Sequence, residues 1–148
     1  MTWLLDTNVV SNSVRDRPDP AISRWIADIP RAETAISIVT LAELWDGATS
    51  VSDKARRRRL MNWVKNEVTP IFEQRTLPLT RDVLADWLRL SRALRARRIT
   101  RDPSDMLIVS TARSNNLTLV TRNVRNFANT GVVVYDPWRD ETHEMEQP

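Results

Sequence analysis

The sequence contains no cysteine, one histidine and two glycines, and these absences exclude several kinds of catalytic site. Without cysteine there are no disulfides, thiolate zinc sites or thiol nucleophiles. The only histidine, His143, lies in the polar segment RDETHEMEQP, where we predict a frayed tail, so no Ser–His–Asp triad is expected inside the fold. Gly47 and Gly131 are too few for a P-loop or a dinucleotide-binding glycine motif. The remaining chemistry uses carboxylates, hydroxyls, amides, Arg and Lys, and carboxylates favour a hard metal ion.

The composition is that of one soluble domain, with 148 residues, 41% hydrophobic and 28% charged. No apolar run is long enough to span a bilayer, and MTWLLDTN lacks the pattern of a signal peptide, so we expect a cytoplasmic protein without membrane association. The net charge is +3, and Lys54 and Lys65 are the only lysines among the cations. Arg binds phosphate with two hydrogen bonds, which favours a nucleic-acid partner, although codon bias in a GC-rich genome explains the composition equally well.

Short β-rich runs alternate with helical segments along the chain. Strands are expected at residues 3–5, 34–39, 117–120 and 132–135. Helices are expected after Asp19-Pro20, Thr80 and Asp102-Pro103, each a typical N-terminal cap, and the last of these helices is apolar nearly all round. The alternation predicts a single α/β domain over residues 1–138, with a mostly parallel central sheet flanked by helices on both faces. Residues 139–148 are predicted to form a polar C-terminal tail.

Four polar side chains are expected at the C-terminal edge of this sheet, where ligands bind in such folds. Asp6 ends the first strand, Glu43 lies in the first turn of a helix that Thr40 caps, Asp105 lies in the first turn of the apolar helix, and Asn123 follows a strand. Each has a structural explanation as well: a turn, a capping box, the helix dipole or a cap. Together they favour a site, because crowded carboxylates repel one another unless a cation or protons intervene. A magnesium ion held by such oxygens can hydrolyse a phosphodiester without histidine.

The segments LLDTNVVS, SIVTLAELWDG, DMLIVSTA, LTLVTRNVRNF and GVVVYDPW resemble those of PIN-domain ribonucleases, in the same order. The resemblance runs from Trp3 to Trp138 and is greatest to VapC-type toxins of the FitB-like branch. It implies a metal-dependent endoribonuclease that acts as the toxin of a type II toxin–antitoxin system and cuts tRNA or ribosomal RNA. It also implies that Asp6, Glu43 and Asp105 carry catalysis by holding Mg²⁺, with Mn²⁺ as a substitute.

The resemblance extends to the surroundings of these carboxylates. Thr7, Asn8, Thr121 and Asn123 are expected to hold water or to orient the metal ligands. The fourth metal-binding position of the family is Asp or Asn, and here it is Asn123. Many relatives with Asn at that position have Asp three residues later, where this chain has Asn126. The chain therefore lacks a fourth carboxylate, which affects a second metal site most.

Three arginines on one predicted helix, Arg89, Arg92 and Arg95, recur every third residue and are candidates for contacts with the RNA backbone. A second basic cluster lies at residues 56–59. A solvated helix face explains either group equally well. The resemblance further implies a homodimer and a cognate antitoxin protein that blocks or fills the acidic groove.

Other functions fit part of the pattern. A PIN-like module that has weak or no catalytic activity would bind RNA or a protein partner. In this alternative, Asn123 and Asn126 mark an acidic site that has lost carboxylates. A phosphate-accepting protein of the receiver or aspartyl-phosphatase type would also place Asp6 after the first strand. Such phosphatases usually carry a second Asp where this chain has Asn8. A DNA-directed nuclease of the same fold remains an alternative, because carboxylate chemistry does not distinguish the sugars.

Overall fold

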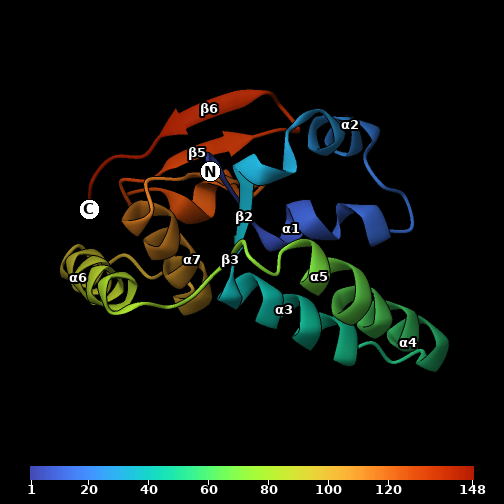
Figure 1. The fold of residues 1–148 in the computed structure, drawn as a ribbon. Coiled ribbons are helices and arrows are strands. Elements are labelled where there is room, and N and C mark those ends of the chain that lie inside the picture. The colour runs from blue at the N-terminus through green and yellow to red at the C-terminus, as the bar shows by residue number, and fades with distance from the viewer.

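The computed structural model describes residues 1–148 and has a six-stranded sheet at its centre (Figure 1). The strand order is β3-β2-β1-β4-β5-β6. The strands are β1 Trp3–Leu5, β2 Thr34–Ser37, β3 Thr76–Leu77, β4 Thr118–Val120, β5 Val133–Asp136 and β6 Glu141–Glu144. The first five strands are parallel, and β6 runs antiparallel to β5. The α/β class with a mostly parallel sheet is thus confirmed.

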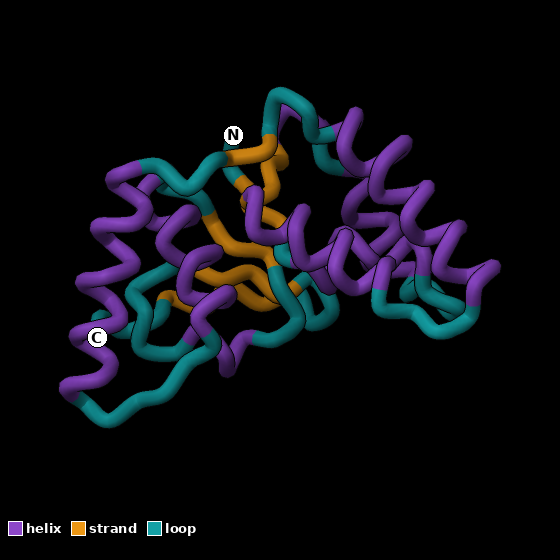
Figure 2. Tube along the Cα trace, turned by 90° about the horizontal axis from the view of Figure 1, so that it is seen from below, coloured by secondary structure: helices purple, strands orange, loops and turns teal.

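Helices lie on both sides of the strands, as the tube in Figure 2 shows from below. The helices are α1 Thr7–Val10, α2 Pro20–Asp28, α3 Ile38–Thr49, α4 Lys54–Trp63, α5 Thr69–Ile71, α6 Arg81–Ala96 and α7 Pro103–Ser114. A π-helical turn, Val64–Val68, joins α4 to α5, and short 3-10 turns cover Ser11–Val14, Arg31–Glu33 and Val124–Phe127. No helix has the length and apolar character needed to cross a membrane.

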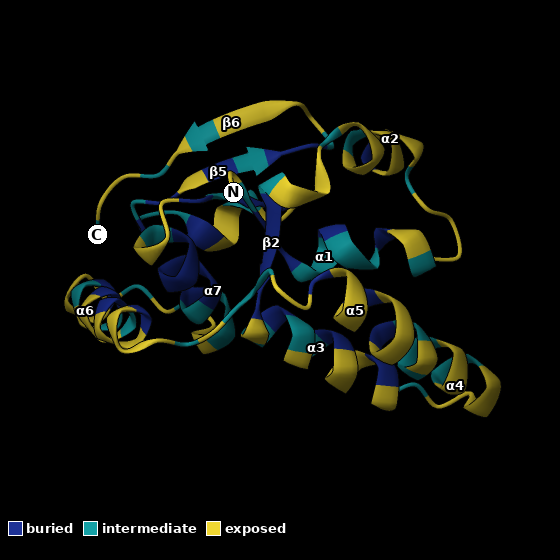
Figure 3. Ribbon diagram, viewed as in Figure 1, coloured by how far each residue is buried: buried dark blue, intermediate teal, exposed yellow.

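The sheet separates two hydrophobic cores because successive residues of a strand point to opposite faces. Leu4 on β1 belongs to the core that α6 and α7 cover, whereas Leu5 belongs to the core under α1 to α4. Leu119 and Val120 on β4 divide in the same way. Helix α7 is buried along most of its length, and α6 packs outside it with one face in solvent (Figure 3). The central strands β1, β2 and β4 therefore end between two covered layers.

Most predicted helix starts are confirmed, but the capping box at Thr40 is wrong. Helix α3 begins at Ile38, where the Ser37 hydroxyl accepts a hydrogen bond from the Val39 N–H at 3.1 Å. Thr40 is buried inside the helix. The apolar run 34–39 therefore divides, because Ser37 ends β2 and caps α3 at once. Glu43 then lies in the second turn of α3, without a capping role.

The C-terminal segment is also different from the prediction. Residues 139–148 contain β6, which pairs with β5 from Asp136 opposite Glu141 to Val133 opposite Glu144. The Met145 N–H continues the pairing by donating to the Val132 carbonyl at 3.0 Å. A polar edge strand lacks the alternation of apolar residues that marks a half-buried strand, so its sequence gives no strand signal. His143 thus lies in the sheet rather than in a frayed tail.

Candidate active site

Asp6 is held in one orientation by the ends of two neighbouring strands. It follows β1, and its Oδ1 accepts a hydrogen bond from the Thr7 N–H at 2.8 Å. Its Oδ2 accepts from the Thr121 hydroxyl, which follows β4, at 2.7 Å and from Asn8 Nδ2 at 3.3 Å. The side chain is 5% exposed, and burial raises the pKa of Asp6 while the hydrogen bonds from Thr121, Thr7 and Asn8 oppose the rise. Asp6 caps α1, yet its second oxygen is positioned by a distant strand.

Glu43 reaches the same edge of the sheet from α3. Its pKa is raised from 4.5 to about 7, first by burial and then by the negative charges of Asp6 and Asp105. The Thr7 hydroxyl lies close enough to offset a small part of this rise, but neither Thr7 Oγ1 nor Glu43 Oε1 makes a hydrogen bond. A buried carboxylate oxygen without a partner is costly. Glu43 is therefore arranged to receive a ligand that the fold itself does not supply.

Asp105 completes the cluster from the first turn of α7. Its pKa is raised from 3.8 to about 6 by burial, then by the charges of Asp6 and Asp102. Asn126 Nδ2 donates to Asp105 Oδ2 at 3.4 Å. Asp102 caps α7 by accepting from the N–H groups of Ser104 and Asp105 at 2.9 and 3.1 Å. The cap occupies Asp102, and Asp105 remains available at the site.

A small hydrogen-bond network fixes the loop after β4 beside Asp6. The Thr121 hydroxyl accepts from Asn8 Nδ2 and from the Asn123 N–H, both at 3.1 Å. Asn8 Oδ1 in turn accepts from the Arg122 N–H at 3.2 Å. Thr121 and Asn8 thus hold the Asp6 side chain and each other at the edge of the sheet. Asn123 contributes its backbone, and its side chain makes no capping hydrogen bond.

The three carboxylates act on one another's charge without forming a preformed cage. No three or more His, Asp or Glu side chains are arranged as a ready metal site. Burial raises the pKa of Glu43 and of Asp105, the negative charge of Asp6 raises both further, and Glu43 Oε1 is buried without a partner. Mg²⁺ is commonly held by one or two carboxylates together with water and substrate phosphate. Asp6, Glu43 and Asp105 fit such an ion, because a cation relieves the repulsion and supplies the missing partner.

Comparison with known proteins places the chain in a family. The model of the family described as PIN domain matches residues 3–133. The chain belongs to the PIN domain family. Toxin FitB of Neisseria gonorrhoeae is 28% identical over 137 residues, which cover 93% of this chain and 99% of FitB. The VapC ribonuclease Y4jK of Sinorhizobium fredii is 30% identical over 136 residues, 91% of this chain and 96% of that protein.

The solved structures agree with the sequence relatives. A chain in the structure of FitAB bound to an IR36 DNA fragment superposes with a TM-score of 0.87 at 26% identity, covering 97% of this PIN domain and 100% of that chain. The resemblance to VapC-type toxins of the FitB-like branch, read from the ordered motifs, is confirmed. These proteins match over nearly their whole length, and the fold of this chain is the PIN-like α/β fold of these neighbours.

Glu43 lines one hollow of the PIN domain, and Asn126, which donates to Asp105, lines another. Neither hollow is lined by the predicted arginines Arg89, Arg92 and Arg95. Those three are exposed on the outer face of α6, and Arg89 Nη2 lies 4.0 Å from Asp86 Oδ1. The structure thus favours the solvated face for them. Other arginines line the hollows: Arg15 and Arg56 beside Glu43, and Arg122, Arg125 and Arg139 beside Asn126.

Of this second set, Arg56 belongs to the basic cluster named at residues 56–59, and a further sequence signal could have found two others. Arg122 and Arg125 follow β4 directly, at the carboxyl edge of the sheet, where ligands bind. Arg139 could not be found in this way, because it approaches only through the turn between β5 and β6. The three-residue spacing identifies arginines along a helix, such as Arg89, Arg92 and Arg95, and does not identify arginines in loops and turns.

Proposed function

We propose that this PIN domain is a Mg²⁺- or Mn²⁺-dependent endoribonuclease, the toxin of a type II toxin–antitoxin pair acting in the cytoplasm, with tRNA or ribosomal RNA as its substrate. The observation that carries the proposal is the charge cluster: Asp6, Glu43 and Asp105 come from three separate elements, and beyond the effect of burial the charge of Asp6 raises the pKa of both Glu43 and Asp105. A fold keeps such repulsion where a ligand compensates for it. The ribonuclease name of the S. fredii relative supports RNA as the substrate class.

The side chains have distinct roles in this proposal. Asp6 is fixed by Thr121 and Asn8 and provides a rigid negative oxygen. Glu43 and Asp105 approach from the two helices and share the site with Asp6. These three carboxylates would hold Mg²⁺, which would supply Lewis-acid chemistry for phosphodiester hydrolysis. Asn126 restrains Asp105 through its hydrogen bond of 3.4 Å without adding charge.

The direct test is RNA cleavage by the purified protein. Total RNA is incubated with Mg²⁺, with Mn²⁺ or with EDTA, and the new ends are mapped. We expect cleavage at one or a few sites with either metal, none with EDTA, and none in Asp6→Ala or Asp105→Asn. Asp102→Asn is the matched control, because Asn still caps a helix, and it should keep most of the activity. Cleavage that survives EDTA or Asp105→Asn would show that the carboxylates are not the catalytic centre.

The missing fourth carboxylate favours a second candidate function, a PIN-like binding module that does not cut RNA. Asn123 and Asn126 leave the site without a fourth carboxylate, and no preformed metal cage exists. A PIN-like module that binds RNA or a protein partner without cutting RNA would have this site. The same incubation separates the two functions, because such a module leaves the RNA intact with Mg²⁺ and Mn²⁺ while still retaining it.

We also propose a cognate antitoxin and a homodimer as the assembly. The toxin name of FitB supports an antitoxin partner, which would cover the carboxylates. Leu84 and Leu88, one turn apart on α6, are 38% and 57% exposed and support a self-association surface. Light scattering should give twice the mass of 17.1 kDa for the wild type, and the monomer mass for Leu88→Arg. A wild-type monomer at high concentration would refute the dimer.

A further inference from the structure

A groove of about 720 Å³ lies beside the carboxylates at the edge of β4 and β5. The loop after β4 forms one wall, with Arg122, Asn123 and Arg125. The turn from β5 into β6 forms the other, with Trp138 and Arg139. Asn126 also lines the groove and donates a hydrogen bond to Asp105 at 3.4 Å. Asn126 thus connects the groove to the site, although Asp6, Glu43 and Asp105 do not themselves line the groove.

The groove is lined by three arginines and two acids, and its arginines form no ion pair. None of Arg122, Arg125 and Arg139 forms an ion pair within 4.0 Å. Of the two acids, Asp136 is buried and accepts from the Trp138 N–H at 2.9 Å, and Glu141 lies 3.4 Å from His143 Nε2. The three guanidinium groups outnumber the two carboxylates, and the exposed, unpaired guanidinium groups are available to an anion.

We propose that this groove binds the backbone of single-stranded RNA next to the bond that is cut, with Arg125 and Arg139 contacting phosphates. The inference rests on the proposed nuclease function, which places a phosphodiester at the carboxylates. A strand entering there continues along the groove, because Asn126 borders both. Guanidinium groups hold phosphate with two hydrogen bonds and supply a binding energy that does not depend on sequence.

The composition of the groove favours RNA over a protein segment. Its only hydrophobic lining residues are Val124 and Trp138, and Arg122 lies over the ring of Trp138 with its guanidinium carbon 5.6 Å from the ring centre. A peptide needs buried apolar anchors, which are scarce here. The covered ring also leaves little aromatic face for base stacking. The groove therefore recognises the backbone rather than particular bases.

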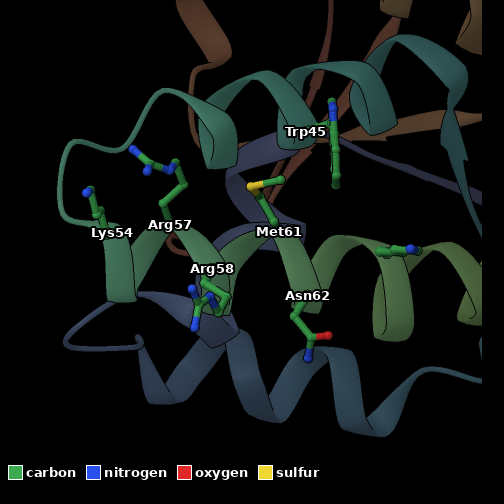
Figure 4. A pocket seen from close by; sticks show the side chains of 7 residues that line it. Trp45, Lys54, Arg57, Arg58, Met61 and Asn62 are labelled. Carbon is green, nitrogen blue, oxygen red and sulfur yellow. The ribbon is translucent and has the colours of Figure 1, made fainter.

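A second basic groove on the same molecule provides the matched control. It lies between α3 and α4 and is lined by Trp45, Lys54, Arg58 and Met61 with other residues of α4 (Figure 4). It shares no residue with the carboxylate cluster or with the groove beside it. Removing Lys54 and Arg58 changes the net charge as much as removing Arg125 and Arg139. All four side chains are exposed, and none makes a side-chain hydrogen bond, so neither change disturbs the core.

The experiment measures binding of a fluorescein-labelled, mixed-sequence single-stranded RNA by anisotropy, with Ca²⁺ in place of Mg²⁺ and the RNA checked for integrity on a gel. For Arg125→Ala/Arg139→Ala we expect affinity to fall about tenfold or more and the salt slope to drop by about 1.4, which corresponds to two lost phosphate contacts. For Lys54→Ala/Arg58→Ala we expect a change of less than about twofold and the wild-type slope. Circular dichroism checks that both variants remain folded.

Equal losses in both variants, or no loss in the first, would overturn the inference. So would an Arg125→Ala/Arg139→Ala variant that binds RNA normally but no longer co-purifies with the antitoxin, because the groove would then be a protein-binding surface.

A cleavage assay in Mg²⁺ distinguishes a failure of the groove assignment from a failure of the proposed nuclease function. If the wild type cuts RNA and the groove variant cuts it with the same KM, the groove assignment alone fails. If the groove variant loses binding but the wild type never cuts RNA, the nuclease function alone fails.

Discussion

Replacing Glu43 by Gln removes one charge from the carboxylate cluster while keeping the shape of the side chain. The pKa of Glu43 rises from 4.5 to about 7 through burial and the charges of Asp6 and Asp105. A carboxyl group with a higher pKa in the folded protein than in the unfolded chain holds its proton more tightly when folded. Stability is then lost as the pH rises from 4.5 through about 7, because the unfolded chain releases its proton first.

This loss sets the size of the expected effect. An unscreened shift of this size would correspond to ~3 kcal/mol at a pH above 7. Glu43 is only partly buried, so solvent screens part of the repulsion, and we expect about 1–2 kcal/mol. Metal-free Glu43→Gln should therefore be more stable than the wild type by that amount at about pH 8, and by close to nothing at about pH 4.5. Mg²⁺ should stabilise the wild type more than the variant, because the cation binds the charged cluster.

Urea unfolding of the wild type and of Glu43→Gln at the two pH values, in EDTA and in Mg²⁺, measures the difference in their free energies of unfolding under each of these four conditions. Glu67→Gln is the control, since Glu67 is exposed on the π-helical turn and lines none of the hollows beside the carboxylates. It should change nothing beyond about 0.5 kcal/mol. A Glu43→Gln protein that is less stable than the wild type at the higher pH would refute the repulsion. So would the same gain at both pH values, because the effect would then not come from charge.

Three further predictions concern the same site and its support. Cleavage in Mg²⁺ should fall as the pH drops below about 7, because Glu43 and then Asp105, with pKa values of about 7 and about 6, take up protons; a rate that rises toward acid pH would contradict this. Asn126→Asp should tighten Mn²⁺ binding about tenfold in calorimetry by adding a carboxylate beside Asp105, and weaker binding would count against a metal site there. Asp86→Ala removes the counterion of Arg113, which donates to Asp86 at 3.0 and 3.2 Å and keeps only its hydrogen bonds to the Thr130 carbonyl and Gln147. This change should lower the free energy of unfolding by about 2–3 kcal/mol, and a loss under about 0.5 kcal/mol would show that the ion pair stabilises little.

The alternation of strands and helices was predictable because its signals are local. Asp19 and Asp102 cap their helices next to proline, as their sequence pattern indicates. Buried strands such as β1 show as apolar runs. Strand β6 was not predictable, because its stability comes from backbone pairing with β5 rather than from apolar side chains. The two-residue β3 is too short to show any period.

The carboxylate cluster was predictable in its membership but not in its details. Asp6 and Asp105 follow from the rule that ligands gather where parallel strands end. The role of Thr121 in holding Asp6 depends on the pairing of β1 with β4, which lie more than a hundred residues apart in the chain. The position of Glu43 was predicted one turn early, because Thr40 matched a cap that Ser37 provides instead. Local patterns identify the chemistry, and contacts between distant segments decide its geometry.

Anomalous scattering from crystals soaked in Mn²⁺ tests the central claim most directly, namely that Asp6, Glu43 and Asp105 together form a cation site. We predict an anomalous peak between the three carboxylates in the wild type and its loss in Asp105→Asn crystals soaked in the same way. Wild-type crystals that take up Mn²⁺ elsewhere, with no peak at the three carboxylates, would contradict the account.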